Sequence, residues 1–263
     1  MRAVFFAAIL MSACCLYAQI PPPQFEVASI KPNESPERSA TWNVDSSGHF
    51  AGTNIPIKFL MMTAYGLKES QLSGVPGWAD GEKYDIQAKG EGAPSEVQLF
   101  AMLQSLLADR FKLRFHWVTK TQSVYALVRA KGGVKLKPSS AGSCVDPAAD
   151  NHPVLPGEKS PDYCGPYYAR RSELDGKRIV ISQILKALGS QLDYPLIDKT
   201  GLKDAYDVHL RWNPDETVND GPDNDGGASI FTALQEQLGL RLQSTKGPVR
   251  VLVIDHIERP SEN

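Results

Sequence analysis

Apolar and polar residues follow the same order of patterns twice along this chain. The first series runs from Gly48 to about Ala130, and the second runs from Gly176 to about His256. Each series has a glycine-containing turn and short strand, an amphipathic helix, a Tyr-Asp-aliphatic strand, a second amphipathic helix and two closing strands. Because an amphipathic helix usually covers a sheet, this order predicts two copies of a small helix-over-sheet unit.

The second helix of each series has the clearest spacing. Ser95 and Ser229 precede these helices at N-cap positions. The apolar residues that follow lie three or four apart, at Phe100, Leu103, Leu107 and Phe111 in the first series and at Ile230, Leu234 and Leu238 in the second. The Tyr-Asp-aliphatic strands are Tyr84-Asp85-Ile86 and Tyr206-Asp207-Val208.

A gap-free alignment of Gly48 with Gly176 superimposes the first helices of the two series. Asn54 and Ser182 then take the N-cap positions. The apolar stripes are Ile57, Leu60 and Ala64 in one helix and Leu185, Leu188 and Leu192 in the other. The predicted fold is α+β, with two tandem repeats that each consist of a small mixed or antiparallel sheet covered by two helices.

Strands are expected outside the helices as well. Phe25–Ile30 has strand character before Pro32, and Thr41–Thr53 forms a hairpin with its turn at Asp45–Gly48. The closing strands alternate with period two, at Leu113, Phe115, Trp117, Tyr125 and Leu127 and again at Leu240, Leu242, Val251 and Val253. Such alternation predicts a half-buried sheet.

The N-terminus has the composition of an export signal. Arg2 is followed by the apolar run Ala3–Leu16 and by Ala18, where we expect cleavage. The run is too short to span a bilayer, which needs roughly 20 residues. We therefore expect a periplasmic or secreted protein with no transmembrane segment in the mature chain. The alternative is a lipid anchor at Cys14, because Met11-Ser12-Ala13-Cys14 loosely resembles a bacterial lipobox.

Four segments follow from these patterns. They are a signal peptide (1–18), a first α+β repeat with an N-terminal strand and hairpin (19–131), an irregular Pro/Gly-rich linker (132–175) and a second α+β repeat (176–263). The linker holds the two cysteines of the mature chain, Cys144 and Cys164. An even pair of cysteines in an exported chain predicts a disulfide. A metal site would need further ligands close by, and His152 alone is near.

Composition argues against nucleic acid as a partner. The formal net charge is -2, whereas phosphate binding needs clustered Lys and Arg. Lys131, Lys135 and Lys137 are expected on solvated turns. The acidic stretch Asn213–Gly227 is expected to be a surface loop, with weak cation binding as its alternative.

No motif predicts a catalytic residue, a cofactor or a metal. Asp198-Lys199-Thr200-Gly201 matches the start of the phosphorylation motif of cation-pumping ATPases, but a glycine turn before Tyr206 explains it better. The five histidines form no His-Glu-x-x-His or His-x-His pair, so catalytic zinc is not expected. They are His49, His116, His152, His209 and His256.

Six stretches resemble a family of exported, uncharacterised "soil-associated" proteins abundant in acidobacteria, which carry a domain of unknown function. The stretches are Phe25–Pro32, Ala64–Leu67, Leu72–Trp78, Tyr84–Lys89, Asp198–Leu202 and Ala233–Leu240. The family has no established activity, cofactor or catalytic residue. In some members a similar domain is joined to membrane metallopeptidases of the β-lactam-sensor type, which implies an extracytoplasmic sensing or interaction role.

Each repeat also resembles, by pattern alone, the short N-terminal domain of secretins and TonB-dependent receptors, a periplasmic interaction module. Leu103–Leu107 and Ala233–Leu240 carry this resemblance. We therefore expect a non-enzymatic module for an unknown protein or envelope ligand. The alternative is a hydrolase of envelope or extracellular polymers, with carboxylates or histidines gathered from distant parts of the chain.

Overall fold

The structure is a computed structural model that describes residues 22–36, 39–45, 47–147, 161–170, 172–213 and 228–260. The chain divides into two compact units. Unit 1 contains the described residues up to Tyr65, the segment Pro76–Leu113 and the residues from His256 onward. Unit 2 contains Gly66–Val75 and Arg114–Asp255. The export segment (1–18) with Cys14, His152 and residues 214–227 of the acidic stretch lie outside the described residues.

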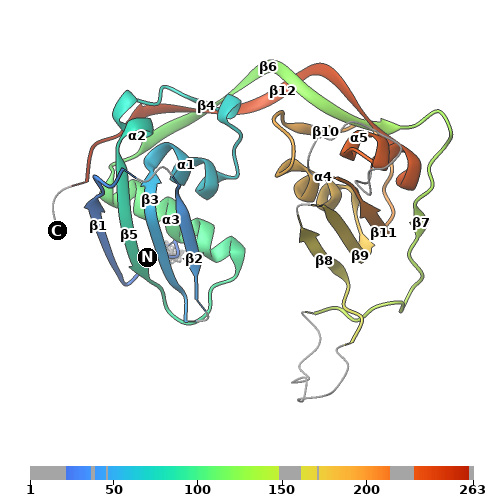
Figure 1. Ribbon diagram of the computed structural model, residues 1–263, viewed down its shortest axis with the longest axis horizontal. Coiled ribbons are helices and arrows are strands. Elements are labelled where there is room, and N and C mark those ends of the chain that lie inside the picture. The colour runs from blue at the N-terminus through green and yellow to red at the C-terminus, as the bar shows by residue number, and fades with distance from the viewer. Residues whose placement is uncertain are drawn as a thin grey trace, which may run out of the picture. The chain divides into compact units, whose positions relative to one another are not determined.

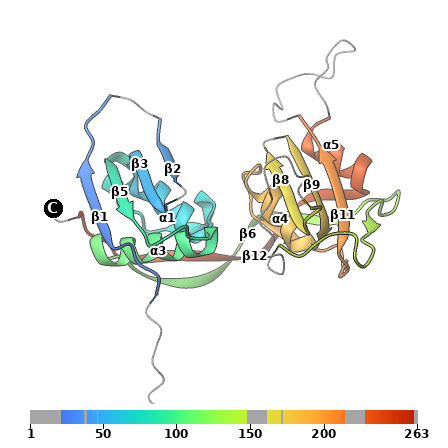
Figure 2. The same ribbon diagram turned by 90° about the horizontal axis from the view of Figure 1, so that it is seen from below.

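Unit 1 is built on an antiparallel sheet, called sheet 1, with the strand order β1-β5-β3-β2. Its strands are β1 (Val27–Pro32), β2 (Thr41–Val44), β3 (His49–Pro56) and β5 (Lys83–Lys89). Its helices are α1 (Ile57–Tyr65), α2 (Gly77–Gly81) and α3 (Glu96–Arg110). Figure 2 shows α3 along one face of sheet 1. Leu103 and Leu107 of α3 are fully buried, as the helical stripe predicts.

Two local signals in unit 1 are confirmed. The Ser95 hydroxyl accepts a hydrogen bond from the Gln98 amide and begins α3 as its N-cap. The predicted hairpin is β2 and β3, with the Gly48 amide donating to the Asp45 carbonyl at 3.1 Å in the turn. The N-terminal strand continues through Pro32, later than expected, and it pairs with β5 at the edge of the sheet.

Unit 2 contains two sheets. Sheet 2 is antiparallel, with the order β7-β11-β9-β8, and the ribbon sheet has the order β10-β6-β12-β4. The strands of sheet 2 are β7 (Lys137–Pro138), β8 (Gly165–Arg170), β9 (Glu173–Ile179) and β11 (Tyr206–Arg211). Those of the ribbon sheet are β4 (Leu72–Ser73), β6 (Arg114–Arg129), β10 (Leu196–Asp198) and β12 (Leu240–His256).

The long strands β6 and β12 dominate the ribbon sheet (Figure 1). The short strand β10 pairs in parallel with β6, and β4 pairs in parallel with β12. The helical elements of unit 2 are η1 (Glu69–Gln71), α4 (Ile181–Gly189), α5 (Ile230–Ala233) and the π-helical turn η2 (Leu234–Leu238) that continues α5. Ile230, Leu234 and Leu238 are buried in one core cluster, and Ser229 is the N-cap of α5, both as predicted.

The N-cap predictions for the first helices are wrong. Asn54 lies in β3 with a φ of 63°, and Ser182 is the second residue of α4, whose N-cap is Val180. The gap-free alignment puts Ile57, the first residue of α1, on Leu185, but α4 begins four residues earlier, at Ile181. Four residues are close to one helical turn of 3.6 residues, so the apolar stripe is almost the same in both alignments. The buried residues of α4 are Ile181, Ile184 and Leu188; of the expected stripe, Leu188 and Leu192 are buried and Leu185 packs against the same core cluster.

Three further expectations differ from the structure. The two closing strands expected in each series are one continuous strand, β6 in the first series and β12 in the second. Residues 132–175, expected to be irregular, contain β7, β8 and the start of β9. The sequence gives no clear sign of β8, because its first residues, Gly165-Pro166, are typical of loops. In the structure, β8 accommodates them with a bulge after Pro166. Trp117, expected on a half-buried sheet face, is 36% exposed on β6.

Cys144 and Cys164 form a disulfide with their Cα atoms 5.1 Å apart, which confirms the predicted pairing. Such bonds are typical of oxidising, extracytoplasmic compartments. In the described part of the chain, no helix is long and apolar enough to cross a membrane.

Candidate functional site

Sheet 2 carries a row of charged side chains on its exposed face. Along β11, Tyr206, Val208 and Leu210 are buried, so Asp207, His209 and Arg211 lie on the opposite face. Their neighbours on β9 have matching chemistry. Asp175 is directly opposite His209, and Glu173 is directly opposite Arg211.

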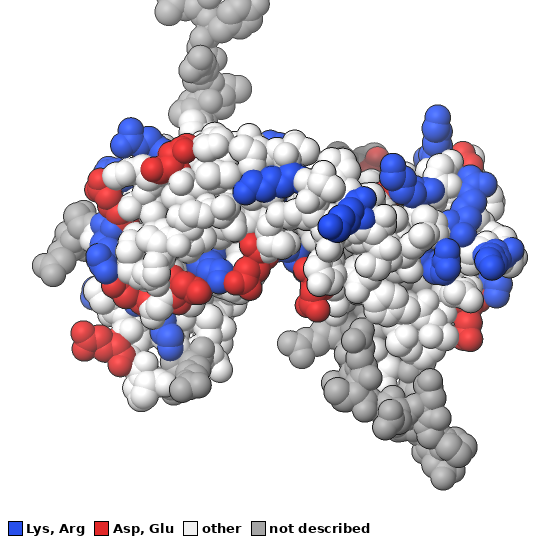
Figure 3. Space-filling model, turned by 90° about the horizontal axis from the view of Figure 1, so that it is seen from above, with Lys and Arg blue, Asp and Glu red and all other residues white. Residues whose placement is uncertain are grey.

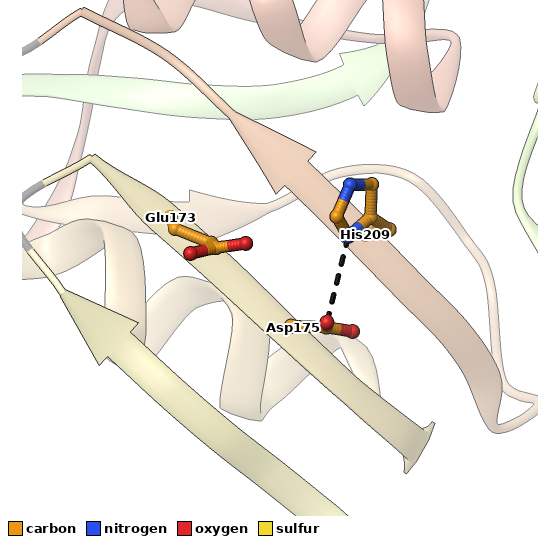
Figure 4. A group of neighbouring side chains, drawn as sticks. All are labelled: Glu173, Asp175 and His209. Atoms are coloured by element: carbon orange, nitrogen blue, oxygen red, sulfur yellow. Dashed lines mark ion pairs between the residues drawn. The ribbon is translucent and has the colours of Figure 1, made fainter.

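Glu173, Asp175 and His209 form a compact group, called here the Glu-Asp-His cluster (Figure 4). One carboxylate or imidazole atom of each lies within 4.8 Å of the others. The Nδ1 atom of His209 is 3.5 Å from an oxygen of Asp175. On the other side of the cluster, Arg211 Nε donates to Glu173 Oε1 at 2.9 Å. All four side chains are accessible, with Glu173 the least exposed at 27%.

A cavity of about 490 Å³ adjoins this group, and Glu173 and Arg211 both line it. Gln237 of η2 also lines the cavity and fixes the end of β11. Its side chain accepts from the Arg211 amide at 3.0 Å and donates to the Arg211 carbonyl at 2.7 Å. The hydrogen bonds with Gln237 therefore hold the Arg211 backbone in place at the wall of the cavity, where the Glu173–Arg211 pair can contact a bound molecule.

No sequence motif marks this cluster, because its members come from different strands. Asp175 and Glu173 fell in the expected linker, and no spacing motif joins them to His209. The available signal was the alternation in Tyr206–Arg211, which puts every second residue on the solvent face. The partner strand was the missing information.

Three other described histidines each face a single carboxylate. His116 Nδ1 lies 2.7 Å from Asp255, and His256 Nε2 lies 2.7 Å from Glu258. His49 lies 3.8 Å from Asp45. A single carboxylate and one imidazole form an ion pair when the histidine is protonated, but they are too few ligands for a strong metal site.

The Asp-Lys-Thr-Gly motif forms a turn. Asp198 Oδ1 accepts from both the amide and the hydroxyl of Thr200 at 2.8 Å, and Thr200 is 4% exposed. Arg129 Nε donates to the Thr200 carbonyl at 2.7 Å. With its carboxylate engaged in the turn, Asp198 acts as a structural residue, as the sequence suggests.

Unit 1 has a cavity of about 590 Å³ beside Glu82, Tyr84 and Arg259. Arg259 forms a two-pronged pair with Glu82, and the Tyr84 hydroxyl donates to the same carboxylate at 3.0 Å. The hydrogen bond from Arg259 is the main cause that lowers the pKa of Glu82, while burial raises the pKa of Tyr84 to about 12. The lowered pKa keeps the Glu82 carboxyl ionised at neutral pH, and the raised pKa keeps the Tyr84 hydroxyl protonated, so Glu82 is a weak base and Tyr84 a weak nucleophile there.

The outer strands of sheets 1 and 2 differ in how they are protected. β1 ends with Lys31-Pro32, β7 is Lys137-Pro138, and β8 begins with Gly165-Pro166 and has a bulge. Proline, lysine and bulges are the usual devices that block pairing at a sheet edge. β2, with the sequence Thr-Trp-Asn-Val, has none of them.

Trp42 is the prominent side chain of β2. It is 41% exposed, lies opposite Gly52 of β3, and its ring stacks at 6.0 Å on the buried ring of Phe50. Trp42 thus continues the apolar face of sheet 1 out to the unprotected edge.

Charged side chains are distributed unevenly on the surface. Figure 3 shows acidic and basic groups mixed over the visible part of unit 1, and more basic groups over that of unit 2. Lys131, Lys135 and Lys137 are exposed, as expected, but Lys137 lies in strand β7 and not in a turn. Lys135 Nζ donates to the Glu236 carbonyl at 2.7 Å, so it holds η2 in place.

A family model matches residues 58–257, which is most of the chain. The chain belongs to the family described as "Protein of unknown function (DUF3738)". No curated protein and no solved structure matches it. The match confirms that the chain carries a domain of unknown function. The Glu-Asp-His cluster and the disulfide lie within the matched residues, and β2 precedes them.

Proposed function

We propose that this chain is an exported, non-enzymatic binding module, and that a protein partner adds a strand to the outer edge of β2. One observation carries the proposal: among the described residues, β2 is the outer strand of sheets 1 and 2 that has no proline, charge or bulge. An unpaired strand edge presents amide and carbonyl groups in the register that another strand needs.

The residues of β2 define the chemistry of the partner. Main-chain hydrogen bonds would supply affinity, and the side chains beside the new strand would supply specificity. Trp42 offers a large, partly exposed aromatic surface next to the buried ring of Phe50. We therefore infer an extended, uncharged segment with an aromatic or aliphatic residue placed beside Trp42.

Export is part of the proposal. Its support is the signal-like composition of residues 1–18, the disulfide and the resemblance to exported soil-associated proteins. Mass spectrometry of the exported protein distinguishes cleavage after Ala18 from lipid attachment at Cys14. An intact N-terminus in the cytoplasm would contradict export.

We also infer that two copies of one unit are present, as the resemblance to short secretin and TonB-receptor domains suggests. In each unit a hairpin leads into a helix, and a later strand with a Tyr-Asp pair joins the same sheet. Asp85 Oδ1 accepts from the amide of Asn54, and Asp207 Oδ1 accepts from the amide of Arg178. Asn54 and Arg178 both have left-handed backbones, with φ of 63° and 54°. The shared hydrogen bond and the shared left-handed backbone favour an alignment of the two units in which Asn54 matches Arg178.

The second candidate function is a hydrolase that acts on envelope or extracellular polymers. The Glu-Asp-His cluster beside its cavity favours it, because carboxylates and a histidine from separate strands converge there. Turnover of an envelope polymer by the purified chain, lost in His209→Gln, would replace the binding-module proposal.

The test of the proposed edge uses peptides selected from a random displayed library for binding to the purified chain. We expect Trp42→Lys to abolish binding of the selected peptides, since a charge at an edge opposes strand addition. Val27→Lys is the matched control, because Val27 is 67% exposed on β1 at the opposite edge of sheet 1. Binding is measured by fluorescence anisotropy.

Backbone N-methylation tests the mode of binding. Methylation of alternate amides in a selected peptide removes the donors that face β2 and leaves every side chain in place. We expect one of the two alternating methylation patterns to abolish binding. If both methylated peptides bind like the parent, or if Trp42→Lys and Val27→Lys have equal effects, strand addition at β2 is wrong.

A further inference from the structure

We propose that Glu173, Asp175 and His209 bind one divalent transition-metal ion of the zinc type on the exposed face of sheet 2. This inference is independent of the proposed partner site, because it rests on other residues and another sheet.

The separation of the candidate ligand atoms fits such an ion. Zinc binds imidazole nitrogen and carboxylate oxygen at about 2.0–2.2 Å, so tetrahedral ligand atoms lie on the order of 3.3 Å apart. The three candidate atoms already lie within 4.8 Å of one another. Side-chain rotations alone can close the remaining gap, since the carboxylates and the imidazole are at the ends of rotatable side chains.

The sheet places these side chains together before any ion binds. β9 and β11 are both inner strands, so each is hydrogen-bonded to a strand on either side. Asp175 and His209 are direct partners across this strand pair, and Glu173 is two residues from Asp175 on the same face. Ligands on the strands of a sheet are positioned more precisely than ligands on loops.

The donor set selects the class of metal. One imidazole with two carboxylates suits Zn²⁺ and similar first-row ions, whereas Ca²⁺ takes six to eight oxygen ligands. Three protein ligands leave a coordination position for water or for a group of a bound molecule. Because the cluster is accessible and adjoins the cavity at Glu173, such a group can reach the ion.

Arg211 gives the proposed metal site a consequence that can be tested. Its guanidinium occupies Oε1 of Glu173 and places a positive charge beside the cluster. It leaves the other oxygen of Glu173 for the ion and orients the carboxylate, but its charge opposes the binding of a cation. Arg211→Gln removes this charge and keeps a side-chain amide that can donate to Glu173, so it should strengthen metal binding. An ion pair without a metal site predicts no such effect.

The experiment titrates the metal-free, disulfide-bonded full chain with ZnCl₂ by calorimetry, and with CoCl₂ by visible absorption. We expect one Zn²⁺ per chain, binding at least about tenfold weaker in His209→Gln, and binding several-fold tighter in Arg211→Gln. His116→Gln is the matched control, since that exposed histidine faces the single carboxylate of Asp255. It should leave Zn²⁺ binding unchanged. Circular dichroism checks that each variant is folded.

The same titrations can overturn the proposal. It is wrong if the chain binds no stoichiometric Zn²⁺, if His209→Gln binds as tightly as the parent chain, or if His116→Gln weakens binding equally. A Ca²⁺ titration that displaces Co²⁺ at equal concentrations would also contradict it, because an all-oxygen site would then explain the binding.

Discussion

Replacing Asp85 tests whether its carboxylate stabilises the left-handed backbone in β3. Asp85 Oδ1 accepts from the Asn54 amide at 3.0 Å and from the Asn33 side-chain amide at 2.7 Å. Asn54 is 2% exposed and has a φ of 63°, a region that a residue with a side chain rarely adopts. Asp85→Ala removes this acceptor from a buried donor.

The expected loss of unfolding free energy follows from these contacts. A hydrogen bond to a charged group contributes about 1.5–3 kcal/mol, and the Asn54 amide is shielded from replacement water. We therefore expect Asp85→Ala to cost about 3 kcal/mol. The matched variant is Asp207→Ala, where the bond to the Arg178 amide is 3.3 Å long and exposed. Its cost should be below about 1 kcal/mol, since water can take its place.

Urea denaturation followed by fluorescence and circular dichroism measures both losses. Amide hydrogen exchange at Asn54 adds a local measurement, and Asp85→Ala should accelerate it more than it accelerates exchange in α4. Equal losses for Asp85→Ala and Asp207→Ala, or a loss below about 1 kcal/mol for Asp85→Ala, would refute the argument from burial.

Three further predictions concern covalent, steric and electrostatic contributions. The double variant Cys144→Ser, Cys164→Ser should lower the unfolding free energy measured by urea denaturation by about 3 kcal/mol, because the disulfide closes a loop with a sequence separation of 20. Free thiols in the oxidised parent protein would contradict the disulfide. Gly239→Ala should lower the thermal midpoint far more than Gly66→Ala; both have a left-handed φ, but an added Cβ meets a backbone oxygen at Gly239 and open space at Gly66. The pKa of Glu82 is lowered in the folded state, so the ionised carboxylate stabilises the fold above the ordinary glutamate pKa, and this stabilisation is lost as the pH falls through the lowered pKa. The difference in unfolding free energy between the parent chain and Glu82→Gln should therefore shrink in acid.

Local patterns made the helices predictable. Ser95 and the spacing of Leu103 and Leu107 belong to one continuous segment, so sequence alone identifies the cap and the buried face of α3. The same periodicity misplaced the start of the first helices, because a four-residue shift preserves a helical stripe. The left-handed backbone at Asn54 has no periodic signal.

The candidate sites depended on information that the sequence does not contain. The Glu-Asp-His cluster requires the register that puts Asp175 opposite His209. The unprotected edge of β2 requires the strand order, because a strand with no proline or lysine is unremarkable at the centre of a sheet. Strand pairing between segments that are distant in the sequence therefore determines both candidate sites, and local sequence patterns do not reveal this pairing.

The division of the chain between the units has a consequence for biogenesis. Unit 1 begins near the N-terminus yet includes the C-terminal residues, and Arg259 pairs with Glu82 across 177 positions. As the polypeptide emerges from a ribosome or a translocation channel, every segment of unit 2 is available before unit 1 receives its last segment. A premature stop before His256 would thus remove a segment of the unit whose first strands were synthesised earliest.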